Sequence, residues 1–349
     1  MTTTAAYAAA SKKDPLKPFE IERREPGEHD VEIDIHFCGV CHSDIHQSRD
    51  EWGGALFPMV PGHEITGKVN RIGSAVTKFK VGDSVGVGCF VDSCRTCDMC
   101  KTSLQQYCSH QVCYTYNSHE KDGKTLTFGG YSKKIVVDEN YVLHIPDSLP
   151  LDKAAPLLCA GITTYSPLRH WNIKKGDKVA VVGLGGLGHM AVKLAAAMGA
   201  EVTVLSTSEN KKADALRLGA SHFINTKDPS VFTKYINHFD FMINTAAGNI
   251  KLDQYVKLLK YDKTMVIVGV PETPYQLGAS SLIGNRRHIA GSLIGGIKET
   301  QEMLDFCAAH HITSDIELIP IEKINEAYER TIKGDVRYRF VIDINSLNN

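Results

Sequence analysis

The chain lacks any hydrophobic run close to the roughly 18 residues that a membrane-spanning helix needs, so we expect no membrane span. Its first residues, 1–13, lack a basic segment followed by an apolar stretch, and nothing in them predicts a signal peptide. It also lacks an excess of either charge, because 39 Lys and Arg residues stand against 40 Asp and Glu residues. A net charge of −1 offers no basic field to nucleic acid or anionic lipid. We therefore expect a cytoplasmic protein without nucleic-acid or membrane partners.

Repeats, low-complexity tracts and long linkers are absent from the 349 residues as well. At about 150 residues per domain, this length predicts two domains, and it is ample for burying a core without disulfide bridges. Hydrophobic residues make up 43% of the chain and charged residues 23%, which is typical of a globular protein. We expect two domains that pack together rather than being tethered by a linker.

The first 150 residues are predicted to be mostly β-structure. Val31, Ile33, Ile35 and Phe37 alternate with polar residues, which is the period of a half-buried strand. Two further strands are expected over 65–72 and 83–90, where Val and Gly are frequent and Gly-containing turns form the boundaries.

From about Gly161 onward, strand and helix patterns alternate roughly every 30 residues, as in parallel βαβ units. We expect strands over 178–182, 201–205, 240–244 and 264–269, with helices over 187–198, 210–218 and 252–260. These elements predict a doubly wound parallel sheet of the Rossmann type. The remaining chain is expected to form helices over 299–310 and 322–333 and a strand over 336–344.

Four of the ten cysteines form a cluster with the spacing C-x2-C-x2-C-x7-C, namely Cys94, Cys97, Cys100 and Cys108. Four thiolates this close in sequence can surround one zinc ion in a closed tetrahedral site, which stabilises a lobe that has little core of its own. Three alternatives remain: metal-free thiols, an iron–sulfur cluster, and a zinc module that grips nucleic acid. Ferredoxin-like cysteine spacings differ from this one, and no basic stripe surrounds the cluster.

A second metal site is suggested by Cys41, His63 and Cys159, a Cys2His donor set suited to zinc with an open coordination position. From the residues alone, alternatives stay open: Cys159 lies in an apolar stretch typical of a buried thiol, and a lone histidine is often only hydrogen-bonded. Cys38 and Cys41 also form a C-x-x-C pair, which would suit a redox motif, although it opens no evident βαβ unit.

A glycine-rich turn follows the strand predicted at 178–182 and opens a helix. It has the pattern G-x-G-x-x-G, formed by Gly183, Leu184, Gly185, Gly186, Leu187 and Gly188. In this context the first glycine permits the tight turn, the second lets a pyrophosphate approach the backbone, and the third packs the helix on the strand. Free amides at the helix N-terminus then receive the phosphates. A tight turn without a ligand is the alternative.

The end of the second strand indicates which nicotinamide cofactor is used. An acidic residue there would bind the ribose 2′-hydroxyl and repel a 2′-phosphate. This chain instead has Ser206, Thr207 and Ser208, with Lys211 and Lys212 close behind. Hydroxyl and ammonium groups suit a dianion, so we predict NADP. The alternative is that both lysines belong to a solvated helix face whose charge Glu209 partly offsets.

With these motifs, the sequence resembles the zinc-dependent medium-chain alcohol dehydrogenases, and within them the NADP-dependent cinnamyl alcohol dehydrogenase branch. The resemblance covers essentially the whole chain and rests on CGVCHSD at 38–44, PGHE at 61–64, the four-cysteine lobe, LLCAGITTY at 157–165, GLGGLG at 183–188 and GSLIGG at 291–296. It implies a mostly β, GroES-like catalytic domain over 1–160 and 294–349 that carries a structural zinc lobe. It also implies a Rossmann cofactor domain over 161–293.

The resemblance implies roles for individual residues around the catalytic zinc. Cys41, His63 and Cys159 would be its ligands, and Glu64 a second carboxylate able to approach it. Asp44 would orient the ligating histidine, while Ser43 and His46 would form a proton relay. The implied cofactor contacts are Thr163 behind the nicotinamide ring, His42 and Arg339 at the phosphates, and further residues of the nucleotide domain and the returning chain: Val268, Gly269, Ser292, Ile294 and Gly296.

These roles predict an enzyme with two zinc ions per chain that reversibly reduces aromatic or medium-chain aldehydes to primary alcohols with NADPH. A polyol or secondary-alcohol dehydrogenase is one alternative, and a nicotinamide-binding protein without catalysis is another, although the intact zinc and relay residues argue against the latter. An apolar substrate pocket is expected, and its candidate residues are Trp52, Leu56, Phe57, Cys113, Tyr114 and Tyr116. Relatives are commonly dimers that extend the nucleotide-domain sheet, so we expect a homodimer.

Overall fold

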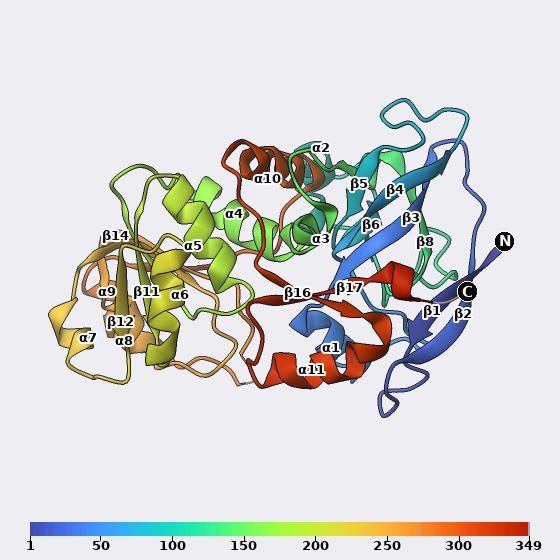
Figure 1. Cartoon of the computed structure of the whole chain (residues 1–349). Coiled ribbons are helices and arrows are strands. Elements are labelled where there is room, and N and C mark those ends of the chain that lie inside the picture. The colour runs from blue at the N-terminus through green and yellow to red at the C-terminus, as the bar shows by residue number, and fades with distance from the viewer. Residues whose placement is uncertain (272, 348–349) are drawn as a thin grey trace. The chain divides into compact units, whose positions relative to one another are not determined.

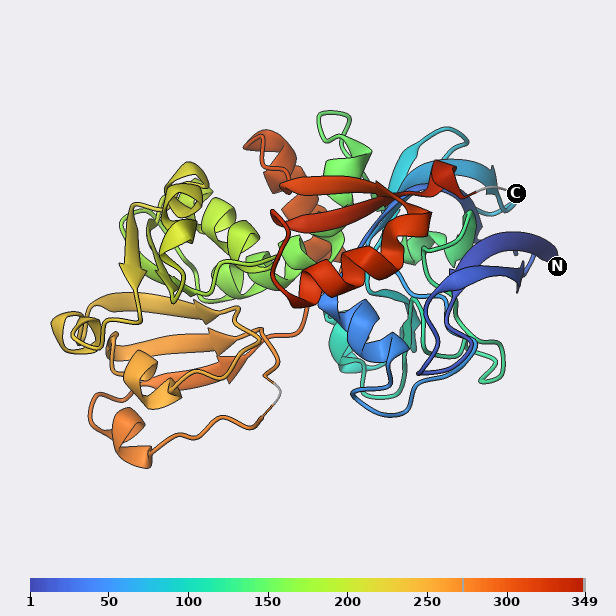
Figure 2. The same cartoon turned by 60° about the horizontal axis from the view of Figure 1, so that its bottom comes forward.

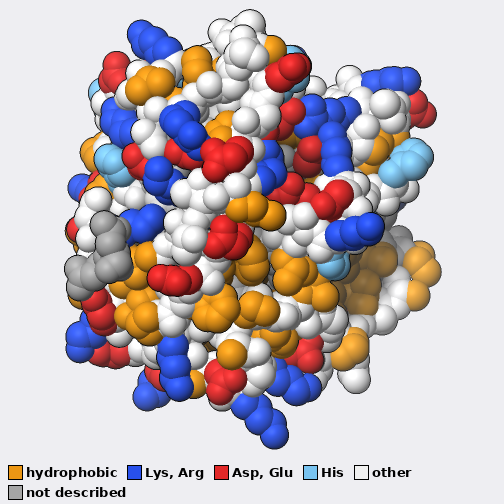
Figure 3. All heavy atoms as spheres, turned by 90° about the vertical axis from the view of Figure 1, so that its right-hand side faces the viewer, with side chains coloured by type: hydrophobic (Ala, Val, Ile, Leu, Met, Phe, Trp, Pro, Cys, Tyr) orange, Lys and Arg blue, Asp and Glu red, His pale blue; other side chains and the backbone are white. Residues whose placement is uncertain are grey.

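The chain forms two units in the computed structural model, which describes residues 1–271 and 273–347 (Figure 1). One unit comprises 1–162 and 295–349, and the other comprises 163–294. Among the residues described, no helix is both long and apolar enough to cross a membrane. On the face shown in Figure 3, Lys and Arg side chains are interspersed with Asp and Glu, so neither sign of charge gathers there.

The first unit is built on a seven-stranded sheet in which β3, β4, β5 and β9 are antiparallel neighbours and β8 also pairs with β3. The alternation predicted for β3 is present only in part: Val31, Ile33 and Ile35 are buried in the core, but Glu32 is buried as well and Phe37 is half-buried. The strands of this sheet are β3 Asp30–Gly39, β4 Ile65–Ile72, β5 Ser84–Val87, β8 Lys134–Asp138, β9 Leu143–His144, β16 Ile316–Pro320 and β17 Arg339–Asp343.

Two small sheets and several helices complete this unit. The small sheets pair β1 Thr2–Ala8 with β2 Lys17–Arg23, and β6 Phe90–Ser93 with β7 Val112–Tyr114. The helices are α1 His42–Ser48, α2 Asp98–Lys101, α3 Leu151–Ala154, α10 Ile297–Ala309 and α11 Ile324–Ile332; α4 Ala160–His170 begins here and continues into the second unit. Helix α1 packs beside α11 (Figure 1).

The single strand predicted over 83–90 is wrong, because the chain changes sheets within it. Strand β5 ends at Val87, and β6 begins at Phe90 and pairs with β7. Between them, the carbonyl of Gly88 accepts from the Thr115 hydroxyl at 2.5 Å and that of Cys89 accepts from the Thr115 amide at 3.1 Å. The Val- and Gly-rich pattern continues through this bend, so the sequence carries no sign of it.

The second unit contains a six-stranded, fully parallel sheet in the order β12-β11-β10-β13-β14-β15. In chain order this is 3-2-1-4-5-6, the arrangement of dinucleotide-binding Rossmann folds, which confirms the predicted doubly wound sheet. Figure 2 shows helices on both faces of it. The strands are β10 Lys178–Val182, β11 Glu201–Ser206, β12 His222–Asn225, β13 Phe239–Asn244, β14 Leu259–Ile267 and β15 His288–Gly291; the helices are α5 Gly188–Ala197, α6 Lys212–Arg217, α7 Val231–Lys234, α8 Leu252–Val256 and α9 Ala279–Ile283.

The helix predicted over 252–260 is too long. Helix α8 ends at Val256, and Leu259 already pairs with Phe239 of β13 as the first residue of β14. Leu258 and Leu259 are fully buried in the sheet core. Their apolar side chains continue the helical pattern, but the backbone here pairs with the neighbouring strand β13.

Candidate active site and metal centres

The first metal-binding segment lies where β3 ends and α1 begins. Cys41 directly precedes α1, and the backbone N–H of Gly39 bonds to the carbonyl of Glu64 at 3.0 Å. A Cβ at Gly39 would lie 1.9 Å from Oε2 of Glu64, so only glycine permits this approach. The contact brings Cys41 beside the segment that carries His63.

The structure brings Cys41, His63 and Cys159 together, with all three residues buried. The two sulfurs lie 3.9 Å apart, and Nε2 of His63 lies 3.3 Å from Sγ of Cys159. Tetrahedral zinc separates two sulfurs by about 3.8 Å, and a sulfur from a nitrogen by about 3.5 Å. The cluster therefore fits one zinc ion. The contact between the two thiols holds the pKa of Cys41 well below its usual range and that of Cys159 well above it, which favours the thiolate of Cys41.

Glu64 belongs to the same cluster, because one of its carboxylate oxygens lies within 4.8 Å of each of the other three ligand atoms. Its Oε1 forms a buried ion pair with Nη2 of Arg339, while Oε2 has no hydrogen-bond partner among the residues that the structure describes. Burial lowers the pKa of Arg339, but Glu64 and the thiols of Cys41 and Cys159 raise it by a larger amount. The pKa is therefore raised overall, and the guanidinium stays charged. Arg339, a candidate contact for cofactor phosphates, thus lies at the metal cluster.

Asp44 supports two of the candidate ligands. Its Oδ1 lies 3.1 Å from Nδ1 of His63, and its Oδ2 accepts from the backbone N–H of Cys41 at 2.8 Å. An ionised carboxylate only accepts hydrogen bonds, so Nδ1 of His63 carries the proton and Nε2 is left to bind a metal. This is the contact that the resemblance implied.

The two candidate relay residues lie three positions apart on α1 and so share a face of the helix. Ser43 Oγ lies 3.7 Å from Sγ of Cys41, which places the hydroxyl at the metal cluster. Nδ1 of His46 contacts the carboxylate of Glu51, and its ring stacks on Trp52 with centroids 4.8 Å apart. Glu51 was not identified from the sequence. Its position five residues after His46 gives no helical signal, because α1 has ended before it.

The candidate pocket residues are divided between surface and core. Trp52 and Tyr114 are exposed, while Cys113 and Tyr116 are buried. Tyr116 stacks on His63 with ring centroids 5.8 Å apart, which places it against a candidate zinc ligand. Leu56 and Phe57 are half-buried, and the backbone N–H of Leu56 bonds to Asn117 at 2.7 Å.

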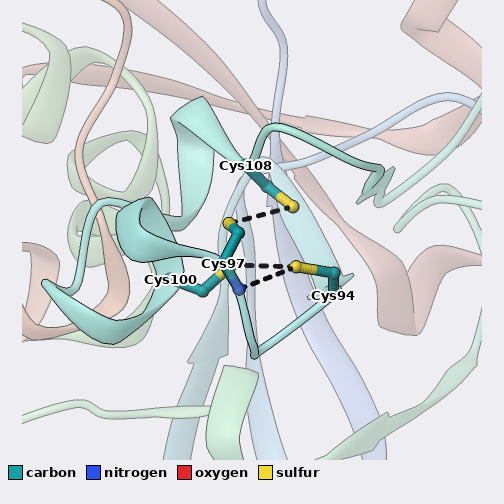
Figure 4. A group of neighbouring side chains, drawn as sticks. All are labelled: Cys94, Cys97, Cys100 and Cys108. Atoms are coloured by element: carbon teal, nitrogen blue, oxygen red, sulfur yellow. Dashed lines mark hydrogen bonds between the residues drawn. The ribbon is translucent and has the colours of Figure 1, made fainter.

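The four-cysteine cluster is also assembled (Figure 4). The sulfurs of Cys94 and Cys100 lie 3.8 Å apart, and those of Cys97 and Cys108 lie 3.9 Å apart, again the spacing of tetrahedral zinc. The backbone N–H groups of Cys100 and Ser109 lower the pKa of Cys97 to about 5. This donor set fits a closed zinc site.

The glycine-rich turn has the geometry expected of a phosphate-binding turn. Gly183 has φ +88°, and a Cβ at Gly188 would lie 2.3 Å from the carbonyl of Gly183. A Cβ at Gly185 would meet nothing within 4 Å, which leaves open space over the second glycine. The turn therefore fits a pyrophosphate at the start of α5.

The residues after β11 form a small polar group beside this turn. The Ser206 hydroxyl accepts from the Ser208 amide at 3.2 Å, and Thr207 is exposed. Nζ of Lys211 donates to the carbonyl of Leu184 at 2.8 Å, which places the ammonium at the glycine-rich turn. Glu209 is occupied elsewhere, since Lys212 lies 3.9 Å from it and Asn225 donates to it at 2.9 Å.

The other cofactor candidates occupy both units. His42 is exposed at the start of α1, and Thr163 is buried in α4. The amides of Val268 and Gly269 both bond to the carbonyl of Asn244, at 3.0 and 3.1 Å. In the returning segment, the Ser292 amide bonds to Ile267 at 3.3 Å, and Ile294 is buried with φ +36°.

Two family models match the chain: the alcohol dehydrogenase GroES-like domain over residues 27–147 and the zinc-binding dehydrogenase over residues 186–309. The sequence is 61% identical over 348 residues to NADP-dependent alcohol dehydrogenase C 1 of Mycolicibacterium smegmatis, covering 99% of each chain. It is 55% identical over 344 residues to the aldehyde reductase YahK of Escherichia coli, covering 98% of each chain.

Two solved structures support the same conclusion. A cinnamyl alcohol dehydrogenase from Sorghum bicolor is 44% identical, with a TM-score of 0.97 and coverage of 100% of both chains. The structure of CAD from Helicobacter pylori complexed with NADP(H) is 46% identical, with a TM-score of 0.92 and coverage of 99% of both chains. The chain belongs to the zinc-binding alcohol dehydrogenases, in the branch that resembles cinnamyl alcohol dehydrogenases.

Proposed function

We propose that this protein reversibly reduces aldehydes to primary alcohols with NADPH at a zinc ion held by Cys41, His63 and Cys159. The observation that carries the proposal is the convergence of these three buried donors at zinc-binding distances. The names of the relatives, an NADP-dependent alcohol dehydrogenase and an aldehyde reductase, support the reaction class. The half-buried Leu56 and Phe57 and the buried Tyr116 favour aromatic or medium-chain aldehydes.

Zinc in this site would polarise the substrate carbonyl as a Lewis acid, and the reduced nicotinamide would supply the hydride. Two thiolates and a neutral imidazole offset the charge of the ion, and three protein ligands leave one position open. Asp44 keeps Nε2 of His63 directed at the ion. Glu64, with its unpartnered Oε2, is the second carboxylate near the metal, and Arg339 restrains it.

The proton that the product alcohol needs comes from Ser43 Oγ at the metal cluster. His46, one helical turn further along α1, restores it, because an imidazole can both take up and release a proton. The carboxylate of Glu51 on Nδ1 orients this imidazole. Oxidation of the alcohol uses the same residues in reverse.

The second unit would hold NADP. The pyrophosphate would lie on the turn Gly183–Gly188, and the 2′-phosphate beside Ser206, Thr207, Ser208 and Lys211, where no acid ends β11. The remaining cofactor residues would be His42, Thr163, Val268, Gly269, Ser292 and Ile294. On this proposal, residues 161–293 form the cofactor domain, and the rest of the chain forms the catalytic domain.

Two zinc ions per chain, a cytoplasmic location and a homodimer complete the proposal. The second ion would bind the four-cysteine lobe. Strand β15 lies at the edge of the parallel sheet, so its outer backbone groups can pair with a second copy of the chain. Sedimentation velocity should give the mass of a dimer, and Gly291→Pro, which removes an amide on the outer side of β15, should shift it toward the monomer; an unchanged dimer would place the interface elsewhere.

The reaction is tested by assaying purified protein with NADPH and NADH against benzaldehyde, cinnamaldehyde, a short aliphatic aldehyde and a ketose. We expect aldehyde reduction with NADPH and about two zinc ions per chain. Turnover of the ketose alone would indicate a polyol dehydrogenase. No turnover in fully metallated protein would contradict an enzymatic role.

A further inference from the structure

The carboxylate of Asp44 is fully buried and accepts from four donors. Oδ1 accepts from Nδ1 of His63 and from the Gly62 amide, both at 3.1 Å. Oδ2 accepts from the Cys41 amide at 2.8 Å and from the hydroxyl of Tyr131 at 3.3 Å. Tyr131 differs from the other three donors, because it is remote in sequence from every candidate zinc ligand.

The position of Tyr131 is set by close backbone contact with the segment that precedes His63. The amides of Gly129, Gly130 and Tyr131 donate to the carbonyls of residues 60, 62 and 61 at 2.7, 2.8 and 3.0 Å. Gly62 has φ +103°, and a Cβ there would lie 2.7 Å from the Tyr131 ring. The Tyr131 ring itself is fully buried. The hydroxyl is therefore held in place before any metal binds.

We infer that Tyr131 is a positioning residue of the metal centre, whose hydroxyl holds the Asp44 carboxylate in the orientation that supports His63. This inference rests on the zinc site proposed above. Without the hydroxyl, Oδ2 loses one of its hydrogen bonds, and the carboxylate gains freedom to rotate about its Cβ–Cγ bond. At 3.3 Å this bond is longer than an ordinary hydroxyl–carboxylate bond, so it restricts the rotation modestly.

The expected size of the effect follows from the distance to the metal. Loss of a group that hydrogen-bonds a metal ligand directly weakens metal binding about 10- to 100-fold. Tyr131 is one hydrogen bond further from the metal, because it bonds to Asp44 and not to a ligand. We therefore expect Tyr131→Phe to weaken metal binding at the Cys41–His63–Cys159 site about 3- to 10-fold, which is below that range.

A control variant is available on α8 of the second unit. Tyr255 is also a buried tyrosine, and it makes no contact with Asp44 or Tyr131. Tyr255→Phe therefore removes the same atom from a buried tyrosine without removing a bond to Asp44. It should leave metal affinity at the site unchanged.

The measurement uses full-length protein stripped of metal and titrated with Co²⁺ in competition with a chelator. The two centres are resolved because a Cys2His site and a four-thiolate site give different visible absorption spectra. In Tyr131→Phe we expect weaker Co²⁺ binding and a shifted spectrum at the Cys2His site only. The four-cysteine spectrum and the melting temperature should match those of the unchanged protein, which separates positioning from a general loss of structure.

A double-mutant cycle tests whether Tyr131 acts through Asp44. In the Asp44→Asn background, Tyr131→Phe should weaken binding by less than about 2-fold, because the oriented carboxylate is already absent. A full effect in that background, or unchanged affinity in Tyr131→Phe alone, would overturn the inference. Absence of the Cys2His spectrum from the unchanged protein would instead refute the zinc site itself, and this inference with it.

Discussion

At the scale of single residues, the proposed function makes cofactor preference depend on the side chains at the end of β11 and just after it. Ser206 places a hydroxyl where an acid would repel a 2′-phosphate, and Lys211 lies at the glycine-rich turn. We expect Ser206→Asp to lower kcat/KM for NADPH relative to NADH by about 10-fold or more, as a charge facing the phosphate costs at least 1.4 kcal/mol. Steady-state kinetics with both cofactors provide the ratio, and an unchanged ratio would contradict the role of this residue.

Two adjacent lysines, Lys211 and Lys212, allow a matched comparison of their effects on NADPH binding. Lys211 donates to Leu184, whereas the Lys212 ammonium lies near Glu209 on an exposed surface. Lys211→Ala should raise the KM for NADPH about 10-fold with little change for NADH, because it removes a cation beside the phosphate. Lys212→Ala should change neither value by more than about 2-fold. Equal effects of the two substitutions would mean that only the general charge of the surface matters.

The buried pair of Glu64 and Arg339 is a second prediction at this scale. Both side chains are almost completely buried, so removing Arg339 leaves a buried carboxyl group without its partner, where burial already raises the pKa of Glu64 to about 8. Arg339→Met should lower the free energy of unfolding by about 3 kcal/mol, and adding Glu64→Gln should restore part of it. Urea denaturation of the two variants measures both values. If the double variant is less stable than Arg339→Met, the pair is not the cause of the loss.

At the scale of elements, the four-cysteine lobe supports the start of α10. Gln105, which lies between Cys100 and Cys108, accepts from the Ile297 amide at 3.2 Å, and a Cβ at Gly296 would lie 1.8 Å from the carbonyl of Ser103. A metal that fixes the lobe therefore also fixes the point at which the chain returns to the first unit.

Loss of the lobe metal should accordingly destabilise the protein before it affects catalysis. Cys97→Ser should reduce zinc from about two ions to one per chain and lower the melting temperature, because a structural zinc site contributes directly to folding. Hydrogen exchange should quicken near residue 297 in Cys97→Ser and in Gln105→Ala. Gln301→Ala, which removes bonds from α10 to the backbone of His144 instead, is the control. A stable but inactive Cys97→Ser protein would contradict a structural role.

At the scale of the whole molecule, the proposed zinc ligands and the phosphate-binding turn belong to different units. Removing metal with a chelator should therefore abolish aldehyde reduction while leaving NADPH binding within about 3-fold of its original affinity, since most cofactor contacts are expected in the second unit. Nicotinamide fluorescence measures binding to the stripped protein. Loss of NADPH binding together with zinc would show that the metal also maintains the cofactor site.

Sequence patterns predict least well the elements whose ends are determined by contacts with a neighbouring strand. The break after Val87 and the early end of α8 at Val256 both follow from contacts with another strand, whereas the local pattern of apolar residues continues through them. Likewise, Glu51 and Tyr131 carry no motif of their own. Glu51 reaches His46 because α1 ends between them, and Tyr131 reaches Asp44 because segments 87 residues apart fold onto each other.

The amino-acid sequence by itself determined the local sites of this protein: the four-cysteine lobe, the glycine-rich turn and the hydroxyl-ended strand. The residues of each site lie close together in the sequence, so the short length of chain between them keeps them close in space. Cys41 and Cys159, 118 residues apart, were joined with His63, Asp44 and Glu64 by the family resemblance alone, and only the tertiary structure brings them together and adds Tyr131 and Arg339 around them. That convergence depends on burial and backbone packing across the first unit, which no local pattern encodes.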